Sequence, residues 1–297
     1  MVVNRKLIVV ADDLGIGFET DRGIIELACK GVVSATVLLV NSPTARQAVE
    51  AWLRAGKPCD LGWHPCLTLD KPILAPEQVP SLVDSNGNFW KLNTFLTRWM
   101  FGLISQVDVY QEWCAQLTAF REMTGVNPVL VNTHQHVGIL APFANILVQI
   151  LESLPVKPWV RRVVESQKTI NMISGARLKR WFLCSYGKVQ AKALDYNKFP
   201  GAKTMIGLTD PYCLKNVRFF DECLQSGCGD IVELMCHPGY VDTSLIGRDV
   251  TEYGDGLTRR QWELGILGNP QFLNDAAACN YQIVRPSSCM GSGRLAC

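Results

Sequence analysis

Short hydrophobic runs alternate with amphipathic segments along nearly the whole chain. Eight runs have the length of β-strands, and several are hydrophobic at every position, as is typical of parallel strands covered on both faces. These runs span residues 7–12, 36–40, 60–64, 129–133, 159–164, 203–208, 231–236 and 281–284. Segments with helical periodicity lie between most of them, at residues 20–30, 44–55, 107–124, 142–153 and 257–267.

The repeated strand–helix order predicts an α/β fold, either a barrel of parallel strands with outer helices or an open doubly wound sheet. The chain has 297 residues, of which 48% are hydrophobic. A chain of this size buries roughly three quarters of its unfolded surface, which is enough for one large core. We therefore expect a single domain over residues 1–297.

Two segments interrupt the pattern. Residues 69–93 contain Lys71-Pro72, Ala75-Pro76, Val79-Pro80 and Ser85-Asn86-Gly87-Asn88, which are too irregular for a helix or a strand. Long loops inside compact domains are usually functional or disordered. We predict a lid over a binding cleft here, with a plain surface excursion as the alternative. Residues 286–297 are rich in Ser and Gly and are predicted to be a frayed tail.

Charge and cysteine usage exclude several classes of protein. Lys and Arg total 29 against 27 Asp and Glu, a formal charge of +2. This balance gives no overall electrostatic footprint for nucleic acid or acidic lipid. The twelve cysteines are scattered without CxxC spacing, which favours free thiols in a reducing compartment. The first hydrophobic run is too short for a signal peptide, and no run approaches a membrane span. We expect a soluble, cytoplasmic protein.

The chain has four histidines, and each one lies at the end of a predicted strand. They are His64, His134, His136 and His237, and the first strand likewise ends in Asp12-Asp13. Active sites of parallel α/β proteins lie where the carboxyl ends of the strands meet. The sequence therefore predicts two Asp and four His around one cleft.

These residue types favour a catalytic metal. One carboxylate and two imidazoles suit divalent zinc, manganese, cobalt or nickel and leave coordination positions open for water and substrate. Asp12 and Asp13 reach one site only if the chain turns directly after the strand, since adjacent strand residues point to opposite faces. Gly15 and Gly17 make such a turn inexpensive. A dinucleotide-binding turn is disfavoured because the spacing to Gly23 is wrong.

The spacing of His134 and His136 leaves their roles open. Two residues apart on an extended strand, they lie on one face with Cα atoms about 7 Å apart. Both can then bind one ion, or one can bind it while the other contacts the substrate.

Four motifs, in order over nearly the whole chain, resemble the YdjC-like carbohydrate deacetylases, a family that includes a branch associated with hopanoid biosynthesis. They are Val10-Ala-Asp-Asp-Leu-Gly15, Leu61-Gly-Trp-His-Pro-Cys-Leu-Thr68, Thr133-His-Gln-His-Val137 and Glu233-Leu-Met-Cys-His-Pro-Gly-Tyr240. A weaker echo follows in Arg260-Gln-Trp-Glu-Leu264. The resemblance implies a distorted (β/α) TIM-like barrel, one divalent metal ion and removal of N-acetyl groups from amino sugars or glycoconjugates.

The resemblance also implies a role for each matching position. Asp13, His64 and His134 are the expected metal ligands, with Zn or Mg favoured and Mn, Co or Ni as alternatives. Asp12 is the expected general base and His237 the expected general acid. His136 matches a position that supports the ligands or contacts the substrate.

Departures from the family pattern bear on the substrate. Gly138 stands where the family commonly has a third His, and Trp63-His64-Pro65-Cys66 replaces its usual segment. Trp63, with Trp90 and Trp99, is a candidate for stacking on a sugar, because the C–H faces of sugars are apolar. Arg161 is a candidate for contact with the substrate or with Asp12.

Two other functions fit parts of this pattern. The altered segment at His64 and the missing third His fit a sugar-binding or regulatory protein that keeps the cleft without turnover. The same ligands suit a metal hydrolase of another bond, such as a phosphoester, although no phosphate cradle is evident. The oligomeric state, including a homodimer, stays open.

Overall fold

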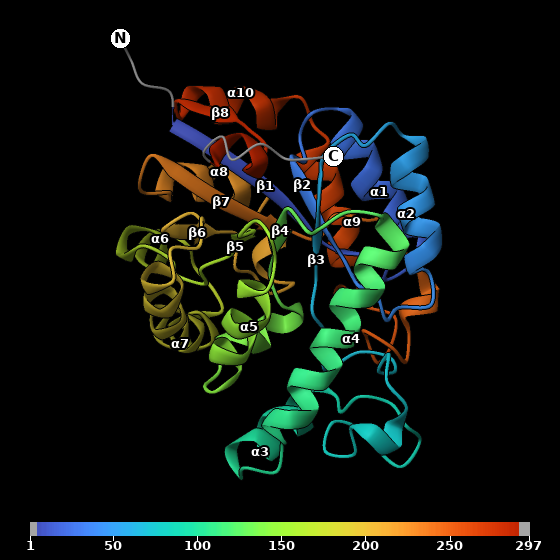
Figure 1. The fold of residues 1–297 in the computed structure, drawn as a ribbon. Coiled ribbons are helices and arrows are strands. Elements are labelled where there is room, and N and C mark those ends of the chain that lie inside the picture. The colour runs from blue at the N-terminus through green and yellow to red at the C-terminus, as the bar shows by residue number, and fades with distance from the viewer. Residues whose placement is uncertain (1–4, 291–297) are drawn as a thin grey trace.

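The computed structural model describes residues 5–290 as a curled parallel sheet with helices packed around it (Figure 1). The strands run in the order β5-β4-β3-β2-β1-β7-β6, and β8 also pairs with β1. They are β1 Arg5–Leu14, β2 Ala35–Leu38, β3 Asp60–Trp63, β4 Leu130–Val131, β5 Trp159–Val160, β6 Thr204–Ile206, β7 Ile231–Cys236 and β8 Tyr281–Ile283. The helices are α1 Phe18–Cys29, α2 Ala45–Arg54, α3 Leu92–Met100, α4 Gln106–Thr124, α5 Phe143–Glu152, α6 Gln167–Met172, α7 Arg177–Tyr196, α8 Phe219–Ser226, α9 Asp255–Leu267 and α10 Gln271–Ala278. Short 3₁₀ turns are η1 Pro76–Gln78, η2 His134–Ile139, η3 Cys213–Lys215, η4 Thr243–Leu245 and η5 Pro286–Cys289.

The sheet forms a distorted barrel with one loosely closed side. Its outermost strands in the pairing order, β5 and β6, form no ladder with each other among the described residues. Just beyond β5, however, the backbone N–H of Met205 donates to the carbonyl of Val164 at 2.8 Å. The predicted TIM-like barrel of parallel strands with outer helices is confirmed.

All eight predicted strands exist, but the prediction made several of them too long, above all β4, β5 and β6, the last of which spans Thr204–Ile206 where 203–208 was predicted. β4 and β5 contain two residues each, where the hydrophobic runs 129–133 and 159–164 predicted five and six. The chain leaves the ladder at these points and brings Asn132 and Arg161 into the barrel interior. Five helices, α3, α6, α7, α8 and α10, were not predicted. Hydrophobic composition indicates that a segment is buried. It therefore does not show where a strand ends and a buried loop begins.

The predicted lid segment, residues 69–93, is held on α4 by buried carboxylates. Glu112 accepts hydrogen bonds from the backbone N–H groups of Ile73 at 2.9 Å and Leu74 at 3.1 Å. Asp108 accepts another from Ser81 at 3.0 Å. These bonds fix the path of the segment, and its action as a lid stays a prediction.

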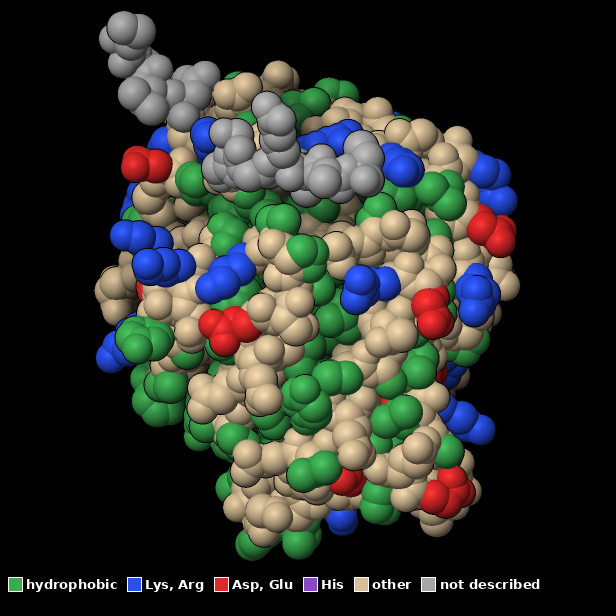
Figure 2. All heavy atoms as spheres, in the orientation of Figure 1, with side chains coloured by type: hydrophobic (Ala, Val, Ile, Leu, Met, Phe, Trp, Pro, Cys, Tyr) green, Lys and Arg blue, Asp and Glu red, His purple; other side chains and the backbone are tan. Residues whose placement is uncertain are grey.

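The predicted tail begins with η5, where the backbone N–H of Ser287 donates to Asp60 Oδ2 on β3 at 2.8 Å. Residues 291–297 of that tail lie outside the described residues. Across residues 5–290, no helix has both the length and the hydrophobicity needed to cross a bilayer. Figure 2 shows basic and acidic side chains scattered over one face, in keeping with the small net charge.

Gly62 allows β3 and β4 to lie in close contact. A Cβ atom at this position would lie 2.3 Å from the Leu130 carbonyl oxygen. We expect Gly62→Ala to lower the free energy of unfolding by about 1–3 kcal/mol, because backbone strands must separate to admit the methyl group. Gly265→Ala is the control, since nothing lies within 4 Å of its added carbon on the exposed side of α9. Urea unfolding of both variants and of the wild type measures the difference. A Gly62→Ala variant as stable as the wild type would contradict the packing described.

Candidate functional site

The acidic and histidine residues singled out in the sequence gather at the carboxyl ends of the strands. Asp12 and Asp13 lie near the end of β1, and His64 directly follows β3. His134 begins η2 just beyond β4, and His237 directly follows β7. Segments that are far apart in the sequence thus meet at one end of the barrel.

A backbone irregularity lets Asp12 and Asp13 serve the same region. Asp13 has φ +69°, in the left-handed range, and the pairing of β1 with β2 shifts register between Ala11 and Leu14. The sequence placed the necessary turn at Gly15 and Gly17, after the strand. In the structure the change of direction begins at Asp13 itself, inside β1. Such bulges commonly redirect side chains beside active sites.

Asp13, His64 and His134 form a compact, buried triangle. Asp13 Oδ1 lies 3.2 Å from His64 Nε2 and 3.0 Å from His134 Nδ1. One ligand atom from each side chain lies within 4.8 Å of the others, and all three residues are buried. A carboxylate and two imidazoles at this separation can hold one divalent cation.

The hydrogen bonding of His64 supports a cation in this triangle. Its Nδ1 lies 2.8 Å from the backbone carbonyl of Asn132. A carbonyl only accepts, so Nδ1 carries the hydrogen, and neutral His64 has a lone pair on Nε2. That lone pair faces the Asp13 carboxylate, which also only accepts. Two acceptors face each other stably when a cation or a proton lies between them, and metal-binding histidines commonly make such a backbone bond through the other ring nitrogen.

The second oxygen of Asp13 is held by Arg260 on α9. Arg260 Nη2 donates to Asp13 Oδ2 at 2.7 Å and to Asp249 Oδ2 at 3.0 Å. Burial raises the pKa of Asp13, but Arg260 and His134 outweigh burial and hold that pKa well below its ordinary value. The carboxylate is therefore ionised at neutral pH, as a metal ligand must be.

Asp12 has its own arginine. Arg161 bonds both of its oxygens, from Nη1 to Oδ2 at 2.5 Å and from Nη2 to Oδ1 at 2.8 Å. The same guanidinium donates through Nε to Glu233 on β7 at 2.5 Å, and Asn132 Nδ2 donates to Asp12 Oδ1 at 3.2 Å. Burial raises the pKa of Asp12, but Arg161 lowers it below the ordinary value. Of the two contacts that the sequence suggested for Arg161, the structure forms the one to Asp12.

His237 lies between two carboxylates. Its Nε2 is 4.0 Å from Asp12 Oδ2, and its Nδ1 is 3.7 Å from Glu263 Oε1 on α9. The backbone N–H of His237 also donates to Glu263 Oε2. Its side chain is 18% exposed, more than those of Asp12 and Glu263 at 3% and 1%, so it is the member of this group that a substrate can reach.

Sequence reasoning assigned no role to Arg260 or Glu263. Both lie in Arg260-Gln-Trp-Glu-Leu264, which was noted only as a weak motif. They are three residues apart on α9, so their side chains extend from the same face of the helix. One contacts Asp13 and the other contacts His237. The charged pair at this spacing was the available signal.

His136 belongs to the same region, but the predicted geometry was wrong. His134 and His136 do not lie on an extended strand, because β4 ends at Val131 and both residues lie in η2. Gln135 and His136 have φ +50° and +60°, which turns the chain sharply. Burial lowers the pKa of His136 well below its ordinary value, and Arg161 lowers it further. His136 is thus a neutral imidazole, and its buried Nδ1 has no hydrogen-bond partner among the described residues.

The structure does not support the predicted sugar contact of Trp63. Its side chain has no exposed surface and packs in the main core. A buried indole offers no ring face to a ligand. Trp90 and Trp99 are half-buried and use their Nε1–H groups within the protein, on the carbonyls of Ser81 at 3.1 Å and Ala141 at 2.8 Å.

Gly138, where a third histidine was expected, fits closely against Thr133. A Cβ atom at residue 138 would lie 2.6 Å from Thr133 Cγ2, and the Gly138 N–H donates to Thr133 Oγ1 at 2.9 Å. A larger side chain would displace this turn of η2.

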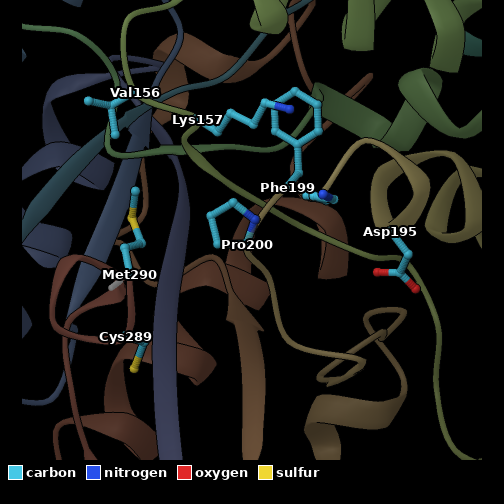
Figure 3. Close-up of a pocket in the computed structure, with 8 residues that line it drawn as sticks. Val156, Lys157, Asp195, Phe199, Pro200, Cys289 and Met290 are labelled. Atoms are coloured by element: carbon cyan, nitrogen blue, oxygen red, sulfur yellow. The ribbon is translucent and has the colours of Figure 1, made fainter. Parts of the chain in front are cut away.

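An open pocket of about 500 Å³ lies elsewhere on the surface (Figure 3). Its lining residues are Val156, Lys157, Asp195, Lys198, Phe199, Pro200, Cys289 and Met290. None of these is a residue of the Asp–His cluster. Lys157 Nζ lies 4.9 Å from the centroid of the Phe199 ring, so this cation already has a cation–π contact within the protein. The pocket lacks the converging carboxylates and imidazoles found at the barrel end.

Comparisons with known proteins agree with this arrangement. The model of the family described as YdjC-like protein matches residues 6–278. A carbohydrate deacetylase of Enterococcus faecalis is 29% identical over 82% of this chain and 84% of its own length. A chitooligosaccharide deacetylase of Yersinia pestis is 28% identical over 95% of this chain and 98% of its own.

A solved structure shares the fold. It is a protein of Enterococcus faecalis named for cellobiose-phosphate cleavage, with a TM-score of 0.75 and 24% identity over 97% of this chain and 99% of that chain. The agreement extends over the entire barrel.

Asp21 supports the turn that carries the two aspartates and should make stability depend on pH. Its Oδ1 accepts from the Gly15 N–H at 2.6 Å, and its buried Oδ2 has no partner among the described residues. Burial is the main cause that raises the pKa of Asp21 to about 7. The hydrogen bond from Gly15 lowers this pKa, and the nearby charge of Asp242 raises it. The folded protein therefore binds a proton that the unfolded chain releases near pH 4, so this group loses its stabilising contribution as pH rises towards 7.

Asp21→Asn removes this proton equilibrium. Between pH 5 and pH 8, the free energy of unfolding of the wild type should fall relative to that of the variant by about 2–3 kcal/mol. Urea unfolding of metal-free protein at both pH values measures the change, with the exposed Asp230→Asn as control. Parallel pH profiles of wild type and Asp21→Asn would show that the carboxyl group is ionised throughout.

Proposed function

This chain belongs to the YdjC-like family, and on that premise we propose that it is a carbohydrate deacetylase, an enzyme that hydrolyses the N-acetyl amide of an amino sugar. The observation that carries the proposal is the buried triangle of Asp13, His64 and His134 beside Asp12 and His237. The relatives named as carbohydrate and chitooligosaccharide deacetylases support the substrate class.

The proposed metal ligands are Asp13, His64 and His134. Two imidazoles among three ligands favour zinc or another late transition metal over magnesium, which prefers oxygen ligands. When bound, such an ion supplies Lewis-acid chemistry, because it polarises the amide carbonyl and makes water a stronger acid. Arg260 keeps Asp13 ionised and fixes the orientation of its carboxylate.

Asp12 is proposed as the general base. Its contact with Arg161 keeps it ionised at neutral pH, so it is ready to accept a proton. The same contact lowers its basicity, so the transfer needs a water molecule whose own pKa is lowered. Asp12 therefore suits hydrolysis assisted by a metal and would be a weak base by itself.

His237 is proposed as the general acid. An amine leaves poorly from a tetrahedral intermediate unless its nitrogen is protonated, and a partly exposed imidazole beside Asp12 can deliver that proton. Glu263 orients the ring through its position near Nδ1 and its bond to the backbone N–H.

His136 is proposed to contact the substrate. As a neutral, half-buried imidazole it offers a hydrogen-bonding nitrogen to the sugar or to the acetyl group. This role leaves the metal to the other three residues.

Removing metal ligands and removing the base should have different effects. We expect about one divalent ion per chain in the wild type, loss of that ion in His64→Ala and His134→Ala, and its retention in His136→Ala. Elemental analysis of purified protein measures the content. If both ligand variants keep the ion, the ligand assignment is wrong.

Asp12→Asn should keep the metal and lose turnover by a factor of about 10²–10⁴, because an amide cannot accept the proton although its oxygen can still accept a hydrogen bond from Arg161. Acetate release from N-acetylglucosamine oligomers measures this, with Asp230→Asn as an exposed control. A metal-loaded wild type that releases no acetate from any such oligomer would instead point to a sugar-binding protein.

A further inference from the structure

The outer face of α7 is hydrophobic where a surface helix is normally polar. Leu178 is 85% exposed, Trp181 67% and Val189 61%, and Tyr196 at the end of the helix is also exposed. The spacings of three, eight and seven residues place these side chains on one face of the helix. The opposite face, which includes Leu183 and Leu194, is buried against the barrel. The helix therefore has a second hydrophobic face directed away from the core.

A second exposed hydrophobic group lies where α3 turns into α4. Met100 and Phe101 are about three quarters exposed, and Leu103 and Val107 are more than half exposed. No charged residue occurs between Arg98 and Asp108. Figure 1 shows this turn at a tip that projects from the rest of the molecule, and Figure 2 shows hydrophobic side chains there.

Aromatic contacts join the two groups into one surface. The ring centroid of Trp99, on α3, lies 5.8 Å from that of Tyr186 on α7, and Tyr186 lies 4.8 Å from Phe182. We call the combined exposed residues the α3–α7 surface. They are Met100, Phe101, Leu103, Val107, Leu178, Trp181, Val189 and Tyr196.

Unpaired cations border this surface. Arg177, Lys188 and Lys192 are exposed on α7, and none has a carboxylate within 4.0 Å among residues 5–290. The net charge of +2 conceals this local excess of positive charge.

We propose that the α3–α7 surface docks on an anionic lipid bilayer. A helix with cations beside Trp and Leu is the type that lies in the interface of a membrane, where the hydrophobic side chains enter the acyl region and the cations meet anionic headgroups. A projecting hydrophobic tip fits a fluid phase, which closes around it, better than it fits a preformed protein groove.

The docking surface adjoins the catalytic end of the barrel. Helix α7 packs on η2, the turn that carries His134 and His136, and Lys179 lies in the first turn of α7. Its Nζ donates to the carbonyl of Thr209 at 3.0 Å, in the segment beyond β6. Docking through α7 would therefore bring the Asp–His cluster near the lipid headgroups.

Vesicle co-sedimentation of the full chain tests the proposal. We expect binding to vesicles of phosphatidylcholine with phosphatidylglycerol, weak binding to phosphatidylcholine alone, and weaker binding at high salt. Lys188→Glu with Lys192→Glu should weaken binding by at least about fivefold per cation. Met100→Ser with Phe101→Ser should weaken it through the loss of hydrophobic insertion.

Controls on α2, away from this surface, separate docking from general surface effects. Leu53→Ser removes another exposed hydrophobic side chain, and Arg46→Glu reverses another exposed cation without a described ion pair. Both should bind vesicles like the wild type. All variants should keep the wild-type melting temperature and the wild-type rate on a water-soluble N-acetylated sugar.

Several results would overturn the proposal. One is the absence of binding to anionic vesicles, and another is equal binding to neutral vesicles. A third is equal loss of binding in the α2 controls. If the Met100 and Phe101 substitutions instead dissociate an oligomer and leave vesicle binding intact, the surface is a contact between copies of this chain. Vesicle binding is measured without substrate, so failure of the deacetylase proposal gives a separate result.

Discussion

The site depends on the burial of two adjacent carboxylates, each of which has an arginine of its own. Asp12 and Asp13 are both 2% exposed, and an unpaired charge at that depth costs several kcal/mol. Arg161 bonds Asp12, and Arg260 bonds Asp13. These arginines come from the segment after β5 and from α9, on separate parts of the chain. The carboxylates therefore become stable only when the barrel has brought these segments together.

This pairing also divides the chemistry between neighbours in the sequence. The left-handed conformation of Asp13 directs its carboxylate to His64 and His134, while Asp12 lies near His237. An ordinary strand would send the two side chains to opposite faces of the sheet. The bulge in β1 thus places the proposed metal ligand and the proposed base side by side, while each carboxylate keeps hydrogen-bond partners of its own.

The same end of the barrel combines a charged, hydrogen-bonded interior with a hydrophobic exterior. Inside, charged groups are fixed by hydrogen bonds from β7, α9 and the segment after β5. Outside, α3 and α7 expose hydrophobic side chains near the same end. Because these helices pack on the barrel through their other faces, the outer residues contribute little to the core. Their hydrophobic character is therefore free to serve an external partner.

The sequence pattern by itself determined the α/β class and the position of the site, and the resemblance to a family added the choice of a barrel over an open sheet. Hydrophobic runs ending at Asp12, His64 and His237 are local features, and parallel strands necessarily carry their ends to one side of a sheet. The motifs supplied the remaining roles by resemblance to a family. A linear pattern also records which residues are hydrophobic, which is why all eight strands were found.

Only the tertiary structure decided which groups touch. Arg260 and Glu263 acquire partners through the packing of α9, and their separation in sequence from Asp13 and His237 hides those contacts. Trp63 proved to be buried, because hydrophobicity does not distinguish a core side chain from a binding one. The positive φ of Asp13 was likewise invisible, since surrounding contacts impose that conformation against local preference.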